Sequence, residues 1–85
     1  MKVSIIMPVY NDESTVSSAV ESVLSQSHKE WELLIMDDGS TDRTGEVIRS
    51  FCDERIKIFR QENRGQLVAL NNLSPHISGD FVLLL

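Results

Sequence analysis

The chain has 85 residues, of which 41% are hydrophobic and 25% are charged, and its net charge is −5. This is the balance of an ordinary soluble globular protein, and the length allows one small domain of marginal stability. The acidic charge argues against a nucleic-acid partner, because no basic stripe is present to replace the counterions of a phosphate backbone. No run reaches the ~18–20 apolar residues of a membrane-spanning helix, and the N-terminus does not resemble a secretory signal.

The single cysteine excludes an intrachain disulfide. Cys52 lies beside Phe51 in an apolar stretch, so we expect a packing thiol and not a reactive one. One reduced thiol fits a cytoplasmic setting. His28 and His76 lack metal-ligand spacing from each other or from the cysteine, so these residues predict no metal site.

Residues 3–7 form a continuous apolar run in which only Ser4 is polar. Such a run is typical of a strand covered on both faces in a parallel sheet, and Pro8 is expected to end it. An amphipathic helix of about three turns should follow. Its candidate N-caps are Asn11, Asp12 and Ser14, and its apolar stripe is Val16, Ala19, Val20, Val23 and Leu24.

A second strand is expected over residues 33–36, with Trp31 packing at its start. The cluster at 37–42, Asp-Asp-Gly-Ser-Thr-Asp, predicts a turn in which Gly39 supplies backbone freedom. A second helix then follows with apolar residues on one side. Ser40, Thr41 or Asp42 can cap this helix, and its apolar residues are Val47, Ile48 and Phe51.

The third strand is expected over residues 56–59, and a polar turn follows it at 62–65. A third helix is marked by four apolar residues and weakened by the Ser-Pro pair at 74–75. These apolar residues are Leu67, Val68, Leu70 and Leu73. A Gly-Asp pair then leads into a last strand at 81–85.

The order βαβαβαβ predicts an α/β fold with a Rossmann-like open parallel sheet and right-handed crossovers. In such sheets, ligands bind outside the carboxyl ends of the strands. Polar clusters follow three strands directly, at 10–13, 37–42 and 63–65, and they should therefore share one edge. The chain has no Gly-x-Gly-x-x-Gly stretch after the first strand and no Walker-type lysine loop, which counts against an ordinary dehydrogenase or a P-loop enzyme.

Asp37 and Asp38 end the second strand, where successive side chains point to opposite faces. One carboxylate can then face the ligand crevice and accept a hydrogen bond from a base N–H or a ribose hydroxyl. The alternative is that the pair favours the N-terminus of the next helix electrostatically. The residues alone leave both interpretations open.

Two further side chains could contact a ligand at the same edge. Tyr10 lies just past the first strand, where its ring could stack on a nucleobase or simply pack at the surface. Arg64, beside Gly65, could bind phosphate or a base edge, or be an ordinary surface residue of a turn.

Four stretches of the sequence, VSIIMPVYN, SVLSQSHKEWELLIMDDGSTDRT, RQENRG and GDFVLLL, together resemble the start of family 2 glycosyltransferases with the GT-A fold. The similarity spans residues 3–85. It implies transfer of a sugar from a nucleotide-diphospho donor, with a UDP-sugar expected, in polysaccharide or cell-envelope synthesis.

The resemblance also implies a set of nucleotide-binding residues. Tyr10 would stack on the base, Glu13 would approach the ribose, and Asp38 would read the base N–H with Asp37 supporting the same pocket. The loop at 64–65 would close over the base or the diphosphate. The full set is Pro8, Val9, Tyr10, Glu13, Asp37, Asp38, Arg64 and Gly65.

The sequence departs from the family pattern at two places. Leu70 stands where the family commonly has an arginine, and Leu73 stands where a glycine is common. In the family, the strand matching 81–85 runs into an Asp-x-Asp motif that holds Mn²⁺ or Mg²⁺. We therefore expect residues 1–85 to be a truncated nucleotide-sugar-binding half that is inactive alone, with the metal held elsewhere in a cytoplasmic or membrane-associated parent.

Two further expectations concern partners. A receiver-like or scaffolding module is the alternative function, but a receiver would place its acidic pair after the first strand and its phosphorylated aspartate after the third. Here the pair follows the second strand, and Arg60-Gln61 follows the third. The last strand, at 81–85, is an apolar edge that invites self-association.

Overall fold

Four parallel strands form one sheet in the order β3-β2-β1-β4. The computed structural model describes all residues from Met1 to Leu85. Its elements are β1 (Val3–Val9), α1 (Val16–Leu24), β2 (Trp31–Asp38), α2 (Thr44–Arg49), β3 (Ile56–Gln61), α3 (Gln66–Leu73), the 3₁₀ turn η1 (Ser74–His76) and β4 (Phe81–Leu84). The predicted α/β fold and the order βαβαβαβ are confirmed.

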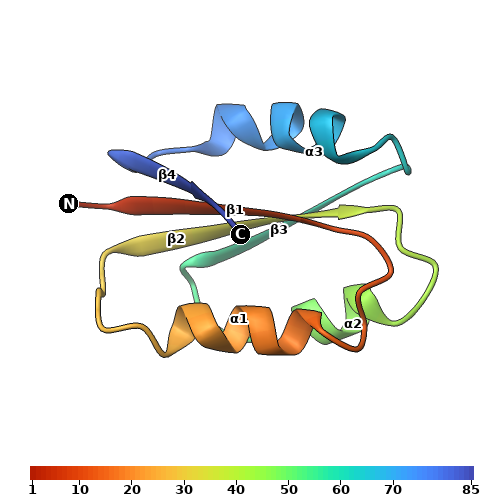
Figure 1. Cartoon of the computed structure of the whole chain (residues 1–85), viewed down its shortest axis with the longest axis horizontal. Helices are drawn as coiled ribbons and strands as arrows, with labels where there is room; N and C mark the ends of the chain where they lie inside the picture. Colours follow the sequence, from red (N-terminus) through yellow and green to blue (C-terminus); the bar gives the residue numbers. More distant parts are fainter.

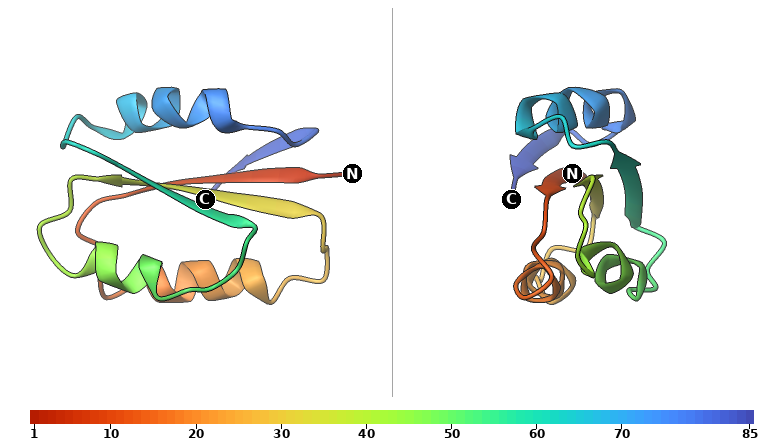
Figure 2. Two further views of the ribbon diagram at one scale, coloured as in Figure 1. Left: turned by 180° about the vertical axis from the view of Figure 1, so that it is seen from behind. Right: turned by 90° about the vertical axis from the view of Figure 1, so that its right-hand side faces the viewer.

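The sheet is a middle layer between helices (Figure 1). Helices α1 and α2 cover one face and α3 covers the other, while β3 and β4 form the two edges, as the end-on view shows (Figure 2). β1 pairs with β2 from Val3 opposite Trp31 to Val9 opposite Asp37. The carboxyl ends of β1, β2 and β3 therefore lie at one edge of the sheet.

Alternate residues of the central strands enter two separate cores. Leu33 and Ile35 pack with α1 and α2 in a cluster of 10 buried residues. Leu34 and Met36 pack under α3 in a cluster of 5. In β1, residues 4–7 are all buried, and Ile5 and Ile6 enter different cores, which confirms that the continuous apolar run at 3–7 marks a strand covered on both faces. Every residue of β2 is buried as well.

Pro8 does not end β1, contrary to the sequence-based expectation. No hydrogen bond of the sheet requires the backbone N–H that proline lacks at this position. Backbone groups in a strand alternate in direction, and the carbonyl of Ile6 faces β4, where it accepts a hydrogen bond from Leu85 N at 3.0 Å. Pro8 faces the same way but lies beyond the paired stretch, which reaches only Ile6. A proline fits this position without breaking a ladder bond.

The helix caps differ in part from those predicted. The residue before α1 is Thr15, and it makes no side-chain cap. Asn11 instead accepts a hydrogen bond from Thr41 N at 2.8 Å, so it holds the loop after β2 in place. The residue before α2 is Arg43, which makes no side-chain cap, so none of the three predicted caps takes this position. Asp42 lies one residue earlier and accepts the N–H of Thr44 at 2.9 Å.

Cys52 is exposed, so the expectation of a packing thiol was wrong. Helix α2 ends at Arg49, and the segment that follows does not continue its apolar side. Phe51 alone turns inward against the larger core.

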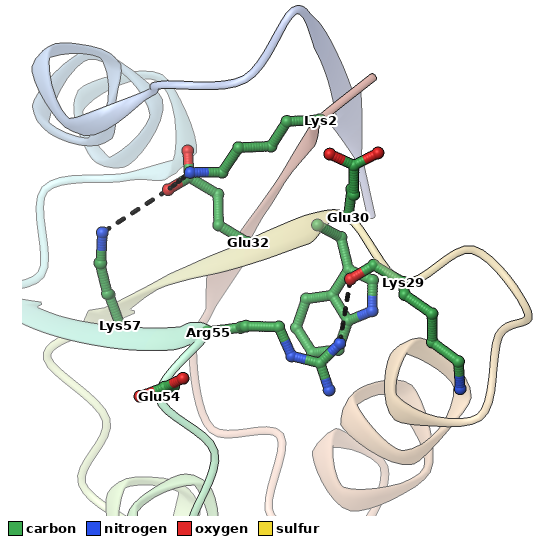
Figure 3. A pocket seen from close by; sticks show the side chains of 8 residues that line it. Lys2, Lys29, Glu30, Glu32, Glu54, Arg55 and Lys57 are labelled. Atoms are coloured by element: carbon green, nitrogen blue, oxygen red, sulfur yellow. Dashed lines mark hydrogen bonds and ion pairs between the residues drawn. The ribbon is translucent and has the colours of Figure 1, made fainter.

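A buried carboxylate stabilises the sheet at the amino ends of its strands. Glu32 lies within β2 with a side chain only 3% exposed, and Ser4 Oγ and Ser78 N donate to its Oε2 at 2.6 and 2.8 Å. Lys2 Nζ and Lys57 Nζ lie 3.5 and 3.6 Å from its Oε1 (Figure 3). Burial opposes ionisation, but the hydrogen bonds from Ser4 and Ser78 and the charge of Lys2 lower the pKa of Glu32 to about 2.

Candidate functional site

The loops after β1, β2 and β3 meet at the carboxyl edge of the sheet, as the sequence predicted (Figure 1). The hydroxyl of Ser40 accepts the N–H of Asn11 at 3.0 Å and so joins the first two loops. Gly39 joins the second loop to the third, because it adopts a φ of 74° and lies directly against Asn63. A Cβ at position 39 would come within 2.7 Å of Asn63 N, so only glycine fits here.

A cavity of about 260 Å³ opens at this edge. It brings together four of the eight predicted site residues, and Tyr10, which is 43% exposed, offers a free ring face. Its lining residues are Pro8, Val9, Tyr10, Asp12, Asp38, Gln66 and Leu85. Asp12, Gln66 and Leu85 were not predicted as site residues.

Asp38 is held in a single orientation by three donors. Its Oδ1 accepts Gln61 Nε2 at 2.9 Å and Arg64 N at 2.8 Å, and its Oδ2 accepts Gly65 N at 3.1 Å. The backbone N–H of Arg64, then the Gln61 amide, lower the pKa of Asp38 below its usual value. A carboxylate has about four acceptor positions, so one remains free on Oδ2 for a ligand donor.

The loop at Arg64 and Gly65 contributes through its backbone. Both N–H groups bind Asp38, whereas the Arg64 guanidinium is exposed and lies 3.5 Å from Glu62. Gly65 has φ 95° and ψ 165°, a region open only to glycine, and α3 begins at the next residue. Gln66, the first residue of α3, lines the cavity, so the positive end of this helix lies at the site.

Asp37 lies on the other face of the sheet and does not line the cavity. Its Oδ1 accepts Ser40 N at 2.9 Å, and its Oδ2 binds Arg60 Nη1 at 2.7 Å. Arg60 also donates to the carbonyl of Ser40 at 3.1 Å. The Asp37–Arg60 pair therefore stabilises the turn after β2.

Glu13 is exposed and also lies outside the cavity lining. Its backbone N–H lies 3.3 Å from Asp42 Oδ2, which places the residue at the outer side of the two loops.

A larger cavity, of about 420 Å³, lies at the amino ends of the strands (Figure 3). Its lining is charged, and these charges are largely paired within the protein, as the two lysines around Glu32 are. Its one aromatic ring, Trp31, is covered by the Arg55 guanidinium at 3.8 Å. This cavity offers no free stacking face, so the carboxyl edge is the better candidate site.

No three His, Cys, Asp or Glu side chains are gathered closely enough to hold an ion. The acids lining the cavity are Asp12 and Asp38, and Asp38 already uses three acceptor positions on protein donors. These residues do not fit the ligand set that Mn²⁺ or Mg²⁺ requires.

None of the helices is long and apolar enough to cross a membrane.

Several relatives are similar over almost the whole chain. A UDP-Glc:alpha-D-GlcNAc-diphosphoundecaprenol beta-1,3-glucosyltransferase of Escherichia coli, WfgD, is 44% identical over 98% of this chain and 33% of its own length. Glycosyltransferase GlyA of Streptococcus pneumoniae is 37% identical over 95% of this chain and 12% of its own length. The chain thus spans a third or less of these relatives.

Solved structures show the same arrangement. TarS 1-349 of S. aureus in complex with UDP-GlcNAc matches with a TM-score of 0.92 and 29% identity, over 100% of this chain and 26% of that one. A mannosyltransferase of Pyrobaculum calidifontis in complex with GDP-Man and Mn²⁺ matches with a TM-score of 0.88 and 26% identity, over 95% of this chain and 26% of that one. Residues 4–85 match the family described as Glycosyl transferase family 2. Together with the parallel sheet and the site at its carboxyl edge, this match shows that the chain belongs to family 2 of the glycosyltransferases.

Proposed function

We propose that residues 1–85 form the nucleotide-sugar-binding half of a glycosyltransferase, and that the carboxyl-edge cavity takes the nucleotide of a UDP-sugar donor. The observation that carries this proposal is the free acceptor position of Asp38 in a cavity that also presents the ring of Tyr10. A base could stack on the ring and donate its N–H to the carboxylate in one pose.

The ionised carboxylate of Asp38 only accepts hydrogen bonds, so it favours bases that carry a ring N–H. Uracil and guanine have such a group, whereas cytosine and adenine present a bare ring nitrogen at the same edge. The small cavity, about 260 Å³, favours the single ring of uracil. UDP-Glc stands in the name of WfgD, and TarS was solved with UDP-GlcNAc, which supports the choice of uridine.

The remaining predicted residues have supporting roles in this proposal. Pro8 and Val9 line the wall of the cavity, and Asp37 holds the turn on which Asp38 stands. Glu13 reaches toward the ribose from the outer loop. Arg64, whose guanidinium is exposed, swings toward the diphosphate near the positive end of α3.

The chain alone is proposed to bind the donor without transferring the sugar. No three His, Cys, Asp or Glu side chains are gathered closely enough to hold a metal, and the chain spans 33% of WfgD and 26% of the TarS chain. In the whole enzyme, a divalent metal would offset the charge of the diphosphate leaving group. We place this enzyme in cytoplasmic synthesis of envelope polysaccharide. The receiver-like alternative gains no support, because Arg60 and Gln61 at the end of β3 bind the acidic pair.

A nucleotide titration tests the proposal. ¹⁵N-labelled chain would be titrated with UDP and, in parallel, with CDP, while the amide signals are followed by NMR. We expect UDP to shift the amides of Tyr10, Gly65 and Gln66, and CDP to bind at least about tenfold more weakly. The proposal would be overturned if millimolar UDP caused no amide shifts, or if the shifts were confined to residues around Glu32 at the amino ends of the strands.

The partner of the exposed edge strand is proposed to be a second copy of the chain. From Phe81 to Leu85, five consecutive apolar residues are between 48% and 55% exposed. Leu85 N bonds to β1, and so does Phe81 N, so the N–H groups of Val82 and Leu84 face outward. Two such edges can pair antiparallel about Leu83, with each Val82 opposite a Leu84, which makes the contact self-complementary.

A further inference from the structure

Three side chains form a hydrogen-bonded series that ends at the cavity. Asn72 Nδ2, on α3, donates to Gln61 Oε1 at 2.7 Å. Gln61 Nε2, at the end of β3, donates to Asp38 Oδ1 at 2.9 Å. Gln61 lies directly opposite Asp38 in the register of β2 and β3 and does not itself line the cavity.

The series has only one consistent direction. The ionised carboxylate of Asp38 only accepts hydrogen bonds, so the amide nitrogen of Gln61 must face it. The amide oxygen of Gln61 is then left to accept from Asn72, which supports this orientation. Reversing the Gln61 amide would set its oxygen against Asp38 and lose that hydrogen bond. Gln61 thus acts with the backbone N–H groups of Arg64 and Gly65 to hold Asp38 in place.

We propose that Gln61 is a positioning residue that sets the base preference of the cavity, with Asn72 as its anchor. By donating to Oδ1, Gln61 orients the Asp38 carboxylate and, after the backbone N–H of Arg64, favours its ionised form, so that the free acceptor position on Oδ2 selects a base with a ring N–H. This inference rests on the proposed nucleotide function and names the pair of residues, outside the cavity, that determines which base is accepted.

Gln61 is the side chain that donates a hydrogen bond to Asp38, and no charged side chain nearby does so. The titratable or charged groups nearby are Tyr10 and Asp12 after β1, and Glu62 and Arg64 after β3. None of them bonds to Asp38 through its side chain, and α3 carries no charged residue. The backbone N–H groups of Arg64 and Gly65 remain in any side-chain variant, so substitutions isolate the contribution of Gln61.

The first test needs no ligand. The side-chain carboxyl of Asp38 would be titrated by ¹³C NMR in the wild-type chain, in Gln61→Met and in Asn72→Ala. Its pKa should rise in Gln61→Met, because a donor to the ionised form is lost, and rise less in Asn72→Ala. Asn71→Ala is the matched control, since Asn71 is an exposed neighbour with no bond to the series, and it should leave the pKa unchanged. An unchanged pKa in Gln61→Met would overturn the role of Gln61.

The second test measures UDP affinity against pH in Gln61→Glu. The introduced carboxyl can share a hydrogen bond with Asp38 only when one of the two acids holds a proton, so the pair should bind UDP normally near pH 5. At pH 8 the two charges repel, and affinity should fall by about tenfold, whereas the wild type stays flat over this range.

The outcomes separate the two proposals. A flat Gln61→Glu profile beside normal wild-type binding would overturn the positioning role and leave the nucleotide function standing. A wild-type chain that binds no UDP would overturn the nucleotide function and the base preference with it. The ligand-free titration decides independently whether Gln61 controls the ionisation of Asp38.

Discussion

Asp37 and Asp38 are neighbours in β2 whose carboxylates lie on opposite faces of the sheet. Each binds the residue directly across from it on β3: Asp37 binds Arg60 at 2.7 Å, and Asp38 binds Gln61 at 2.9 Å. The pairing gives the two acids different neighbours, a guanidinium on one face and an amide on the other. One carboxylate therefore stabilises a turn, and the other is left with an acceptor position for a ligand.

Asp38→Asn should abolish most UDP binding, because the amide cannot replace a carboxylate that accepts from Gly65, Arg64 and the base at once. We expect at least about a 100-fold loss of affinity, together with a lower free energy of unfolding by about 1–3 kcal/mol. Isothermal titration calorimetry and urea unfolding would measure the two effects.

Asp37→Asn is the matched control for that substitution. It weakens the bond to Arg60 away from the cavity, so the free energy of unfolding should fall while UDP affinity stays within about threefold of wild type. Equal losses of UDP affinity in both variants would contradict the division of roles between the two acids.

Gly39→Ala should disturb the site more than Gly65→Ala. Both glycines have positive φ, so each substitution should cost about 1–3 kcal/mol of unfolding free energy. At position 39 the new methyl would also meet Asn63 N at 2.7 Å, whereas at position 65 it meets nothing within 4 Å. Amide shifts that spread from Asn63 to Arg64 in Gly39→Ala are expected, and a purely local change there would contradict the close approach.

The free energy of unfolding should fall at acid pH, because Glu32 then takes up a proton. Its pKa is lowered from 4.5 to about 2, so its stabilising effect is full above about pH 4.5 and lost as the pH falls through 2. The shift corresponds to about 3 kcal/mol of unfolding free energy. The single tryptophan, Trp31, precedes Glu32 and provides a fluorescence signal for urea unfolding at each pH.

Glu32→Gln provides the comparison, because the amide keeps an acceptor oxygen for Ser4 and Ser78 but has no titrating charge. Its unfolding free energy should be lower at pH 7 and should fall less steeply between pH 5 and 2, because Asp53, whose pKa the hydrogen bonds from Arg55 lower to about 2, still titrates there. An equally steep acid loss in this variant would assign the effect to other carboxylates.

Val82→Lys should convert the chain from a self-associating species to a monomer. A lysine on the exposed edge would bring like charges together across the proposed antiparallel contact. Sedimentation velocity over a concentration series would measure the association. Leu67→Lys removes an exposed apolar residue from α3, away from the edge, and should leave association unchanged. A wild-type chain that stays monomeric throughout would refute this contact.

Much of the fold can be predicted from local patterns in the sequence. The continuous apolar run at residues 3–7 predicts a strand covered on both faces, and the alternation of side chains along the second strand predicts that Asp37 and Asp38 diverge. The strand-end position of each polar cluster predicts a shared edge. These inferences depend only on local periodicity and on the handedness of parallel crossovers.

Other features depend on which strands become neighbours, and local pattern does not specify this. Gln61 was expected to follow the third strand, and it gains a role only because it lies in β3 opposite Asp38. Pro8 looked like a strand end because the extent of its neighbour β4 was not evident. Glu32 interrupts an apolar strand, and its burial is tolerated only because Ser4, Ser78 and two lysines converge on it.

The placement of β4 beside β1 has a consequence for the order of assembly. The ten buried residues of the larger core, from Ile5 to Ile48, come from β1, α1, β2 and α2, so most of their contacts close short loops of chain. The pairing of Val3 with Phe81 instead closes a loop of nearly the whole chain. Closing so long a loop costs the most conformational entropy, so this pairing should form last. We expect the β1–β2 unit to protect its amides from hydrogen exchange first during refolding, and β4 to gain protection last. β1 and β4 thus join only after the loops at the carboxyl edge already stand on a formed sheet.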